Sequence, residues 1–168
     1  MGGGMNFRWR KLAGVLLLAA VICLDVSLAQ GADKAPDFAL PAVQDKKIID
    51  MSKLRGKPVL VTFWATWCGP CVLEIPSLIS LQKEFGAQGL VVIGVSVDQG
   101  GEGPVRNVID KTGINYPVIM GDSKLGREFG GVSGIPASFL VDQSGMIRKR
   151  FDGLTSHDVF EKNIKQVL

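Results

Sequence analysis

The feature that most constrains the fold is an apolar run that leads into a pair of cysteines. Val59 to Trp64 is continuously apolar or β-branched, and Cys68 and Cys71 follow it, three positions apart. Such a run is typical of a strand that is buried on both faces. Leucines and a phenylalanine at helical spacing then predict a helix from Cys68 to Phe85, and Leu90 to Val97 forms a second apolar run. Strand, helix and strand predict a right-handed βαβ unit with parallel strands, and therefore an α/β domain.

The rest of the chain supplies elements that extend this unit. We expect an N-terminal hairpin formed by the segments around Phe38–Leu40 and Lys47–Ile49, and then one helical turn capped by Ser52. We expect the domain to span residues 36–168, after a linker at 30–35. Downstream of the second strand the patterns predict, in chain order, a helix at 104–111, a strand at 116–120, a short helix capped by Asp122 or Ser123, strands at 137–141 and 146–151, and a last helix opened by the capping box Thr155-x-x-Asp158.

Residues 1–29 indicate a segment for export rather than a part of the fold. Three basic residues precede the apolar stretch Ala13 to Leu24, and Ser27-Leu28-Ala29 places small residues where a signal peptide would be cut before Gln30. Two alternatives stay open: the segment is retained as an N-terminal membrane anchor, or Cys23 is lipidated. We expect the domain in the periplasm or at the outer face of the cytoplasmic membrane of a bacterium, since the positive charge stays on the cytoplasmic side.

The composition excludes several classes of function. The formal net charge is +3 and no basic stripe is present, which argues against a nucleic-acid partner. A single histidine makes a His-based zinc site improbable, and we expect no metal. Three cysteines are too few for a fold held together by disulfides.

The positions of Cys68 and Cys71 indicate redox chemistry. The end of a buried strand delivers Cys68 to a helix N-terminus, where free N–H groups and the helix dipole stabilise a thiolate. Cys68 is then the exposed nucleophile, and the more buried Cys71 resolves the mixed disulfide. Between them, Gly69-Pro70 forms a turn that the proline, which has no N–H, holds rigid. Two alternatives stay open: a zinc half-site with only His157 left to complete it, and a passive disulfide, which in so small a loop would remove little chain entropy.

The segment Phe63 to Cys71 resembles the active-site segment of the thioredoxin superfamily. Pro76 matches the proline that bends the active-site helix, and Gly134-Ile135-Pro136 matches the loop whose cis proline faces the disulfide. The resemblance covers nearly all of residues 36–168. It implies a thioredoxin fold, in which helices flank a central mixed β-sheet, with an N-terminal β-hairpin extension and an insertion after the central strand.

Within the superfamily, the chain resembles the exported and often membrane-tethered reductases of the TlpA/ResA kind. Ala35-Pro36-Asp37-Phe38 precedes the hairpin, and Glu74 stands three residues after Cys71. An insertion runs from Asp98 to Gly121, and the strand Phe139 to Asp142 follows the cis proline. The resemblance implies a thiol-disulfide oxidoreductase that needs no cofactor besides its own redox-active disulfide.

Glu74 is the residue that the resemblance offers as proton acceptor. Cytoplasmic thioredoxins carry a buried aspartate in the strand before the motif, where this chain has Thr62. Glu74 lies at i+3 from Cys71 on the same helix, which can bring it close to the dithiol beneath the surface. Burial would raise its pKa and fit it to exchange the proton of Cys71. From the spacing alone, a solvated surface glutamate stays open as the alternative.

The resemblance also implies a surface for client proteins. The backbone of Ile135, held beside the disulfide by Pro136, can pair with an extended client strand. Trp67 can flank the site, whereas Asp98 is expected only to open a loop and His157 only to be exposed. The predicted site comprises the catalytic residues Cys68, Cys71 and Glu74 and the substrate-binding residues Trp67, Gly69, Pro70, Ile135 and Pro136.

The expected function is reduction of disulfides in exported client proteins by a monomer. Apocytochrome c and a copper-site assembly protein are compatible clients, and a transmembrane thiol carrier of the DsbD/CcdA kind would return the electrons. A cytochrome c maturation reductase is a narrower alternative, although Ala137-Ser138 stands where such enzymes often carry an acidic residue. A peroxiredoxin shares the opening at residues 35–38, but Val61 and Ala65 occupy the proline and threonine positions of its signature around Cys68. A binding module with a vestigial motif is a third class.

Overall fold

A computed structural model describes residues 34–168 of the chain, and the expected export segment with Cys23 lies outside these residues. The centre of the fold is a mixed five-stranded sheet, made of β3 (Val59–Trp64), β4 (Val91–Ser96), β5 (Val118–Met120), β6 (Ala137–Val141) and β7 (Ile147–Asp152). The strand order is β5-β4-β3-β6-β7. β3, β4 and β5 are mutually parallel, whereas β6 is antiparallel to β3 and β7 is antiparallel to β6. The expected βαβ unit and the terminal strand pair are therefore confirmed.

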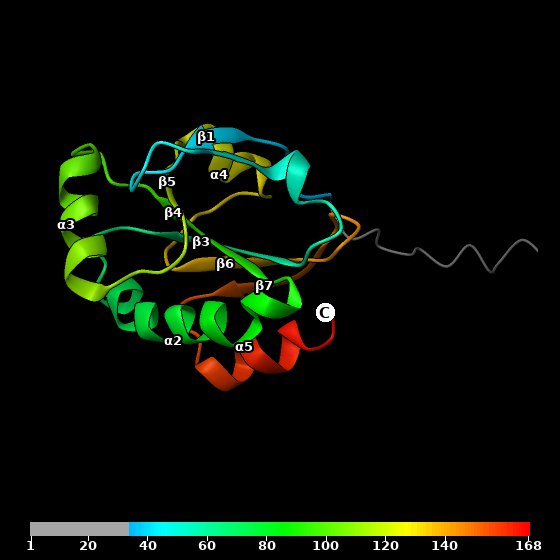
Figure 1. Cartoon of the computed structure of the whole chain (residues 1–168). Helices are drawn as coiled ribbons and strands as arrows, with labels where there is room; N and C mark the ends of the chain where they lie inside the picture. Colours follow the sequence, from blue (N-terminus) through cyan, green and yellow to red (C-terminus); the bar gives the residue numbers. More distant parts are fainter. Residues whose placement is uncertain (1–33) are drawn as a thin grey trace, which may run out of the picture. The chain divides into compact units, whose positions relative to one another are not determined.

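Helices cover both faces of this sheet, and the N-terminal hairpin lies on one of the two faces (Figure 1). On one face lie α2 (Gly69–Phe85), α5 (His157–Ile164) and, toward one end, α3 (Glu102–Thr112), and η2 (Gly86–Gln88) continues α2. The other face carries the hairpin of β1 (Ala39–Pro41) and β2 (Ile48–Asp50), the turn η1 (Met51–Leu54) and α4 (Ser123–Glu128). Within the described part of the chain, no helix is both long and apolar enough to cross a membrane.

Each face of the sheet has its own hydrophobic core, because side chains alternate between the faces along a strand. In β3, Leu60 belongs to the core under α2, α3 and α5, and Phe63 belongs to the core under the hairpin and α4. The ring centroid of Phe63 lies 5.4 Å from that of Phe129 and 5.8 Å from that of Phe139. Burial of each such ring contributes roughly 1.5–3 kcal/mol. The two cores thus fix β3, the strand that leads to the cysteines.

The insertion between Asp98 and Gly121 builds α3 and β5. Because β5 forms an edge of the sheet, it would expose unpaired backbone groups. The segment after β1 covers part of this edge, since the Val43 N–H donates to the Val118 carbonyl at 2.7 Å. The side chain of Gln44 adds two further bonds, to the carbonyl of Tyr116 and from the N–H of Val118.

The turn η1 is capped by a different residue from the one predicted. The carboxylate of Asp50 accepts the N–H of Ser52 at 3.0 Å, so Asp50 and not Ser52 is the N-cap. Both residue types are good caps, and the last residue of β2 is already placed to supply the acceptor.

The predicted capping box at the last helix is also wrong. α5 begins at His157 with Ser156 at the N-cap, and no side chain closes this cap. Thr155 is engaged elsewhere, since its hydroxyl donates to the Gly153 carbonyl at 3.1 Å and its N–H donates to Glu74 Oε1 at 2.8 Å. A tertiary contact has therefore replaced a local one.

Candidate active site

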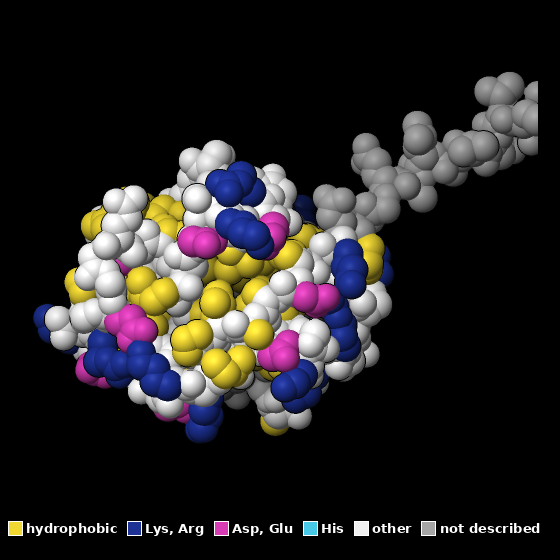
Figure 2. Space-filling model, turned by 90° about the horizontal axis from the view of Figure 1, so that it is seen from above, with side chains coloured by type: hydrophobic (Ala, Val, Ile, Leu, Met, Phe, Trp, Pro, Cys, Tyr) yellow, Lys and Arg dark blue, Asp and Glu magenta, His cyan; other side chains and the backbone are white. Residues whose placement is uncertain are grey.

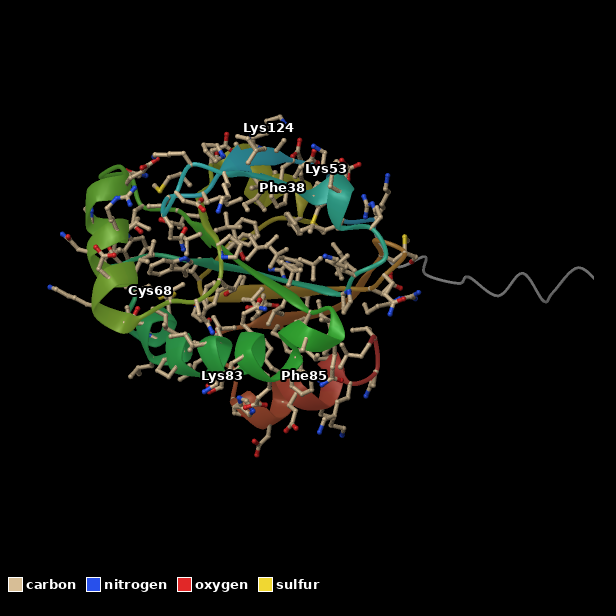
Figure 3. The ribbon with its side chains drawn as sticks, in the orientation of Figure 1. Phe38, Lys53, Cys68, Lys83, Phe85 and Lys124 are labelled. Carbon is tan, nitrogen blue, oxygen red and sulfur yellow. A yellow bond between two sulfur atoms is a disulfide. The ribbon has the colours of Figure 1, made fainter. Side chains whose placement is uncertain are left out.

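The loop from β3 into α2 places Cys68 at the N-cap of the helix. Its backbone is extended, Pro70 lies in the first helical turn, and the N–H of Cys71 donates to Cys68 Sγ at 3.3 Å. Cys68 and Cys71 form a disulfide. The first N–H groups of a helix lack intrahelical partners, so the same contact can stabilise a thiolate on Cys68 once the bond is reduced. Figure 3 shows Cys68 at one end of α2, beside α3, and Phe85 at the other end.

The prediction that Cys68 is an exposed residue is wrong for this oxidised form. Only 7% of Cys68 is exposed, against 2% of Cys71, and both belong to the core under α2. The surface at this point is formed by Trp67, which is 70% exposed, together with the exposed Gly69 and Pro70. One neighbour of the sulfur comes from the cis-proline loop, which lies far along the chain.

That loop lies directly against the disulfide. The Ile135–Pro136 peptide bond is cis, as predicted, and the Ile135 carbonyl oxygen lies 3.7 Å from Cys68 Sγ. Pro136 is buried, and its carbonyl accepts the N–H of Gly153 at 2.8 Å, which ties the loop to the end of β7. Within residues 34–168 the N–H of Ile135 has no hydrogen-bond partner. The loop therefore presents an unused backbone donor beside Cys68.

Glu74 is a buried carboxyl group and not the solvated side chain that its spacing left open. It is 2% exposed, although its carboxylate still accepts one hydrogen bond from the backbone, the Thr155 N–H at 2.8 Å. Burial raises the pKa of Glu74 to about 7, and the hydrogen bond from Thr155 opposes part of that rise. Cys71 and Glu74 are thus buried one turn apart on the same helix.

A buried tyrosine lies near Glu74. Tyr116, which is 4% exposed, belongs to the same core as Cys71. Burial raises the pKa of the Tyr116 hydroxyl, and the negative charge of the nearby Glu74 raises it further. A charge on Glu74 therefore costs free energy to bury, which is the physical reason for its perturbed titration.

Asp98 has a larger part in the site than the sequence indicated. Its carboxylate accepts the N–H of Thr66 at 3.0 Å and the Thr66 hydroxyl at 2.5 Å. It also accepts the hydroxyl of Ser96 at 2.8 Å. These bonds tie the end of β4 to the residue just before Trp67 and so hold the loop that carries Cys68. No local pattern signals this contact, because the bonded residues lie 32 positions apart.

The strand position that carries an aspartate in cytoplasmic thioredoxins is occupied by the buried Thr62. It pairs across β3 and β6 with Ser138. Both hydroxyls are buried, and neither has a hydrogen-bond partner within the described residues. Among residues 34–168, Glu74 is the one buried carboxyl group, and it lies on α2 rather than on β3.

His157 and the two cysteines have the following contacts in the structure. The His157 side chain is half-buried rather than exposed, and its Nε2 lies 3.5 Å from Glu84 Oε2. Cys68 and Cys71 are bonded to each other in a disulfide. Among residues 34–168, no three His, Cys, Asp or Glu side chains gather in a way that could hold a metal ion.

Comparisons with known proteins agree with this geometry. The model of the AhpC/TSA family matches residues 32–150. Thiol-disulfide oxidoreductase ResA of Bacillus subtilis (strain 168) is 33% identical over 140 residues, which cover 83% of this chain and 76% of that protein.

Solved structures give the same result. A thiol:disulfide interchange protein of the thioredoxin family from Chlorobium tepidum TLS has a TM-score of 0.75 and 35% identity, over 81% of this chain and 96% of that one. A putative thiol:disulfide interchange protein DsbE from Chlorobium tepidum has a TM-score of 0.74 and 31% identity, over 82% and 96% of the two chains. With its mixed five-stranded sheet and its disulfide between two cysteines three positions apart, the chain has a thioredoxin-like fold, belongs to the AhpC/TSA family and is a thiol-disulfide oxidoreductase of the ResA/DsbE kind.

Proposed function

We propose that this protein reduces disulfides in exported client proteins, with Cys68 as the attacking residue and Cys71 as the resolving one. One observation carries the proposal: the first two turns of α2 hold the disulfide at the helix N-terminus and a buried Glu74 with a pKa of about 7. A nucleophile stabilised by N–H groups and an acid-base group matched to neutral pH are the two requirements of exchange by a buried dithiol.

The reaction has two exchange steps. The Cys68 thiolate attacks one sulfur of the client disulfide, forms a mixed disulfide and releases the other client sulfur as a thiolate. The Cys71 thiolate then attacks Cys68 Sγ, which forms the Cys68–Cys71 bond and releases the second client sulfur. Two electrons pass from the dithiol to the client, and the protein ends in the disulfide form.

Glu74 serves the second step. Cys71 is buried, so the loss of its proton is unfavourable without an acceptor nearby. Glu74 accepts that proton, and its pKa of about 7 leaves a useful fraction of the carboxylate ready at neutral pH. When the dithiol and Glu74 titrate together, the measured pKa values belong to the group as a whole.

Client binding uses the surface around the disulfide. The free N–H of Ile135 can pair with an extended client backbone, as in β-strand addition, while Pro136 holds the loop against Cys68. Trp67 offers an exposed indole on the other side, next to Gly69 and Pro70. A client cysteine held between these groups would approach the small exposed area of Cys68.

The cellular setting follows from the N-terminal sequence. The export segment at residues 1–29, whether cleaved or kept as an anchor, would direct the domain 36–168 out of the cytoplasm, and we propose separately that the domain acts there as a monomer. Each reaction outside the cytoplasm leaves the Cys68–Cys71 pair oxidised, so the pair must be reduced again. We propose a transmembrane thiol carrier as the electron donor for this step. Apocytochrome c and a copper-site assembly protein are the client classes that we propose first.

A trapping experiment tests the function directly. Cys71→Ala leaves Cys68 able to form a mixed disulfide that nothing resolves, so exported clients should accumulate as covalent complexes. The control is the double variant with Cys68→Ser, which should capture nothing. Alongside, the wild-type protein should reduce insulin disulfides and consume no peroxide in the presence of thiol. Peroxide consumption without disulfide reduction would refute the proposal and favour a peroxidase.

Rapid kinetics test the role of Glu74. Glu74→Gln should keep the reaction of Cys68 and slow the resolving step on the order of 10-fold near neutral pH. Glu84→Gln, an exposed position on the same helix, is the matched control and should leave both steps unchanged. Stopped-flow exchange of a mixed disulfide from pH 5 to pH 9 separates the steps. Equal resolving rates in Glu74→Gln and wild type over that range would show that water, and not Glu74, takes the proton.

A further inference from the structure

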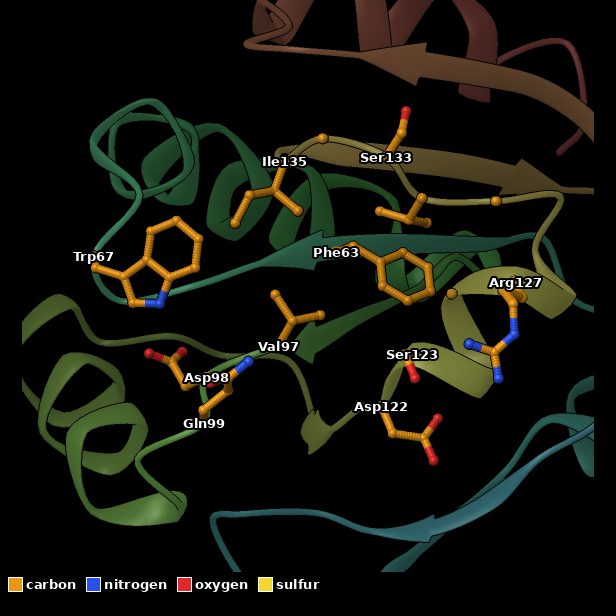
Figure 4. Close-up of a pocket in the computed structure, with 15 residues that line it drawn as sticks. Phe63, Trp67, Val97, Asp98, Gln99, Asp122, Ser123, Arg127, Ser133 and Ile135 are labelled. Carbon is orange, nitrogen blue, oxygen red and sulfur yellow. The ribbon is translucent and has the colours of Figure 1, made fainter.

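A groove of about 800 Å³ leads away from the disulfide on the side of α4. It begins at Trp67 and Ile135, beside Cys68, and ends at α4 (Figure 4). Seen from above, the face that carries the hairpin and α4 has a hollow of apolar side chains with charged side chains around it (Figure 2). A volume of this size lies within the usual range of ligand sites.

The groove is lined by apolar side chains and by glycines, which carry no side chain. Val97, Val132 and Ile135, which are partly exposed, supply the apolar surface, and the buried ring of Phe63 lies behind them. Gly134, just before Ile135, also lines the groove, and a Cβ atom there would meet nothing within 4 Å. The space beside the cis-proline loop is therefore open and can admit the apolar side chain of a bound chain.

The charged side chains that line the groove differ in whether they already have hydrogen-bond or ion-pair partners. Asp98 already accepts bonds from Thr66 and Ser96, and Asp122 caps α4 by accepting the N–H of Leu125 at 2.8 Å. Arg127 lines the same groove and is exposed, and within residues 34–168 its guanidinium makes no ion pair or hydrogen bond. Figure 4 shows its side chain on α4 near Ser123, across the groove from Trp67. Arg127 is thus the charged group of the lining that has no partner.

We propose that this groove selects client segments in which the reactive cysteine is followed or preceded by an apolar residue and then by a carboxylate that pairs with Arg127. The proposal rests on the proposed function, since it names the class of client that the disulfide serves. The apolar residue lies on Val132 and Ile135, which are partly exposed in the groove, and the acidic residue extends beyond it to the guanidinium, which suits carboxylates through its planar set of donors. Because Arg127 is exposed, the pair acts mainly on recognition and association.

Synthetic peptides provide the test. Each peptide carries one cysteine as a disulfide with thionitrobenzoate, a leucine next to it, and either Glu or Gln two, three or four positions away on one side or the other. Reduction is followed with the wild type, Arg127→Gln, Arg127→Glu and the control Lys149→Glu, an exposed position on β7 remote in sequence from the groove. The quantity compared is the ratio of kcat/KM for the Glu peptide to that for the Gln peptide within each variant, so that differences in basal activity cancel.

We expect the wild type and Lys149→Glu to prefer Glu at one position by about two- to fivefold at low salt, as is usual for exposed ion pairs. This ratio should fall to one in Arg127→Gln and below one in Arg127→Glu, and it should shrink at high ionic strength. If the wild type reduces both peptides at equal rates, the inference about the groove is wrong, whereas the proposed function is unaffected. A Glu preference that survives in Arg127→Gln would also overturn it. Failure of the wild type to reduce any peptide would instead contradict the proposed function.

Discussion

Replacing the buried Glu74 by glutamine should stabilise the folded protein at alkaline pH. The native pKa of about 7 lies above the ordinary value of 4.5, because burial disfavours the charged carboxylate. The native state therefore holds this proton more tightly than the unfolded chain does. Between about pH 4.5 and pH 7 the unfolded chain has lost the proton and the native state has not, so stability falls as the pH rises through that window.

The size of the effect follows from the two pKa values. At about 1.4 kcal/mol for each pH unit between 4.5 and about 7, ionised Glu74 costs roughly 3 kcal/mol above pH 7. Glutamine cannot ionise, and its carbonyl oxygen can still accept the N–H of Thr155. The stability difference between Glu74→Gln and wild type should therefore move by roughly 3 kcal/mol, in favour of the variant, between pH 4 and pH 8.

Denaturant unfolding of the oxidised protein at a series of pH values measures this difference, since the disulfide keeps both cysteines from titrating. Glu128→Gln on the surface of α4 is the control, and its effect should stay within about 0.5 kcal/mol at every pH. A Glu74→Gln difference that does not change with pH would refute the reasoning. It would mean that Glu74 ionises in the native state as easily as in the unfolded chain.

Three further predictions concern single positions. In the reduced protein at pH 7, iodoacetamide should modify Cys68 at least about tenfold faster than Cys71, as measured by peptide mapping, because the helix N-terminus stabilises the Cys68 thiolate. Equal rates would contradict the assignment of the nucleophile. Asp98→Asn should lower the free energy of unfolding by about 1–2 kcal/mol and slow disulfide reduction, because charge-assisted bonds to Thr66 are weakened. An unchanged denaturation midpoint would show that the loop is held by other contacts. Thr62→Val should raise the free energy of unfolding by about 1 kcal/mol, because it removes a buried hydroxyl that has no partner. A loss of stability would reveal a bond to that hydroxyl.

The elements that could be predicted from the sequence are those whose signals are local and strong. β3 is a continuous apolar run, and Gly69-Pro70 after Cys68 marks the start of α2. Such patterns depend on the burial and backbone preferences of consecutive residues, so no knowledge of distant contacts is needed. The cis-proline loop was predicted only from the family resemblance. The residues around Pro136 do not show by themselves that the fold brings this loop next to Cys68.

The details that escaped prediction depend on contacts between distant segments. Thr155 fits a capping box, yet its N–H is used by Glu74, 81 positions earlier. Cys68 was expected at the surface, but the loop of Ile135, which leads into the neighbouring strand β6, packs against it. Asp98 carries no local signal for a bond to Thr66. In each case the deciding contact comes from a residue far along the chain, which a local sequence pattern does not reveal.

The pKa of Glu74 results from two opposed contributions that come from different parts of the chain. Burial under α2 raises it, and the N–H of Thr155 lowers it, so the carboxyl group titrates near neutrality. A carboxyl group buried without that N–H would stay protonated and could not accept the proton of Cys71, whereas a solvated one would be too weak a base. The turn between β7 and α5 therefore sets the basicity of the proposed acceptor on α2. The pKa of an aspartate at the position of Thr62 would depend on its neighbours in the central sheet. Because the carboxyl group of this chain lies on α2, its pKa depends instead on the hydrogen bond from Thr155, in the C-terminal part of the fold.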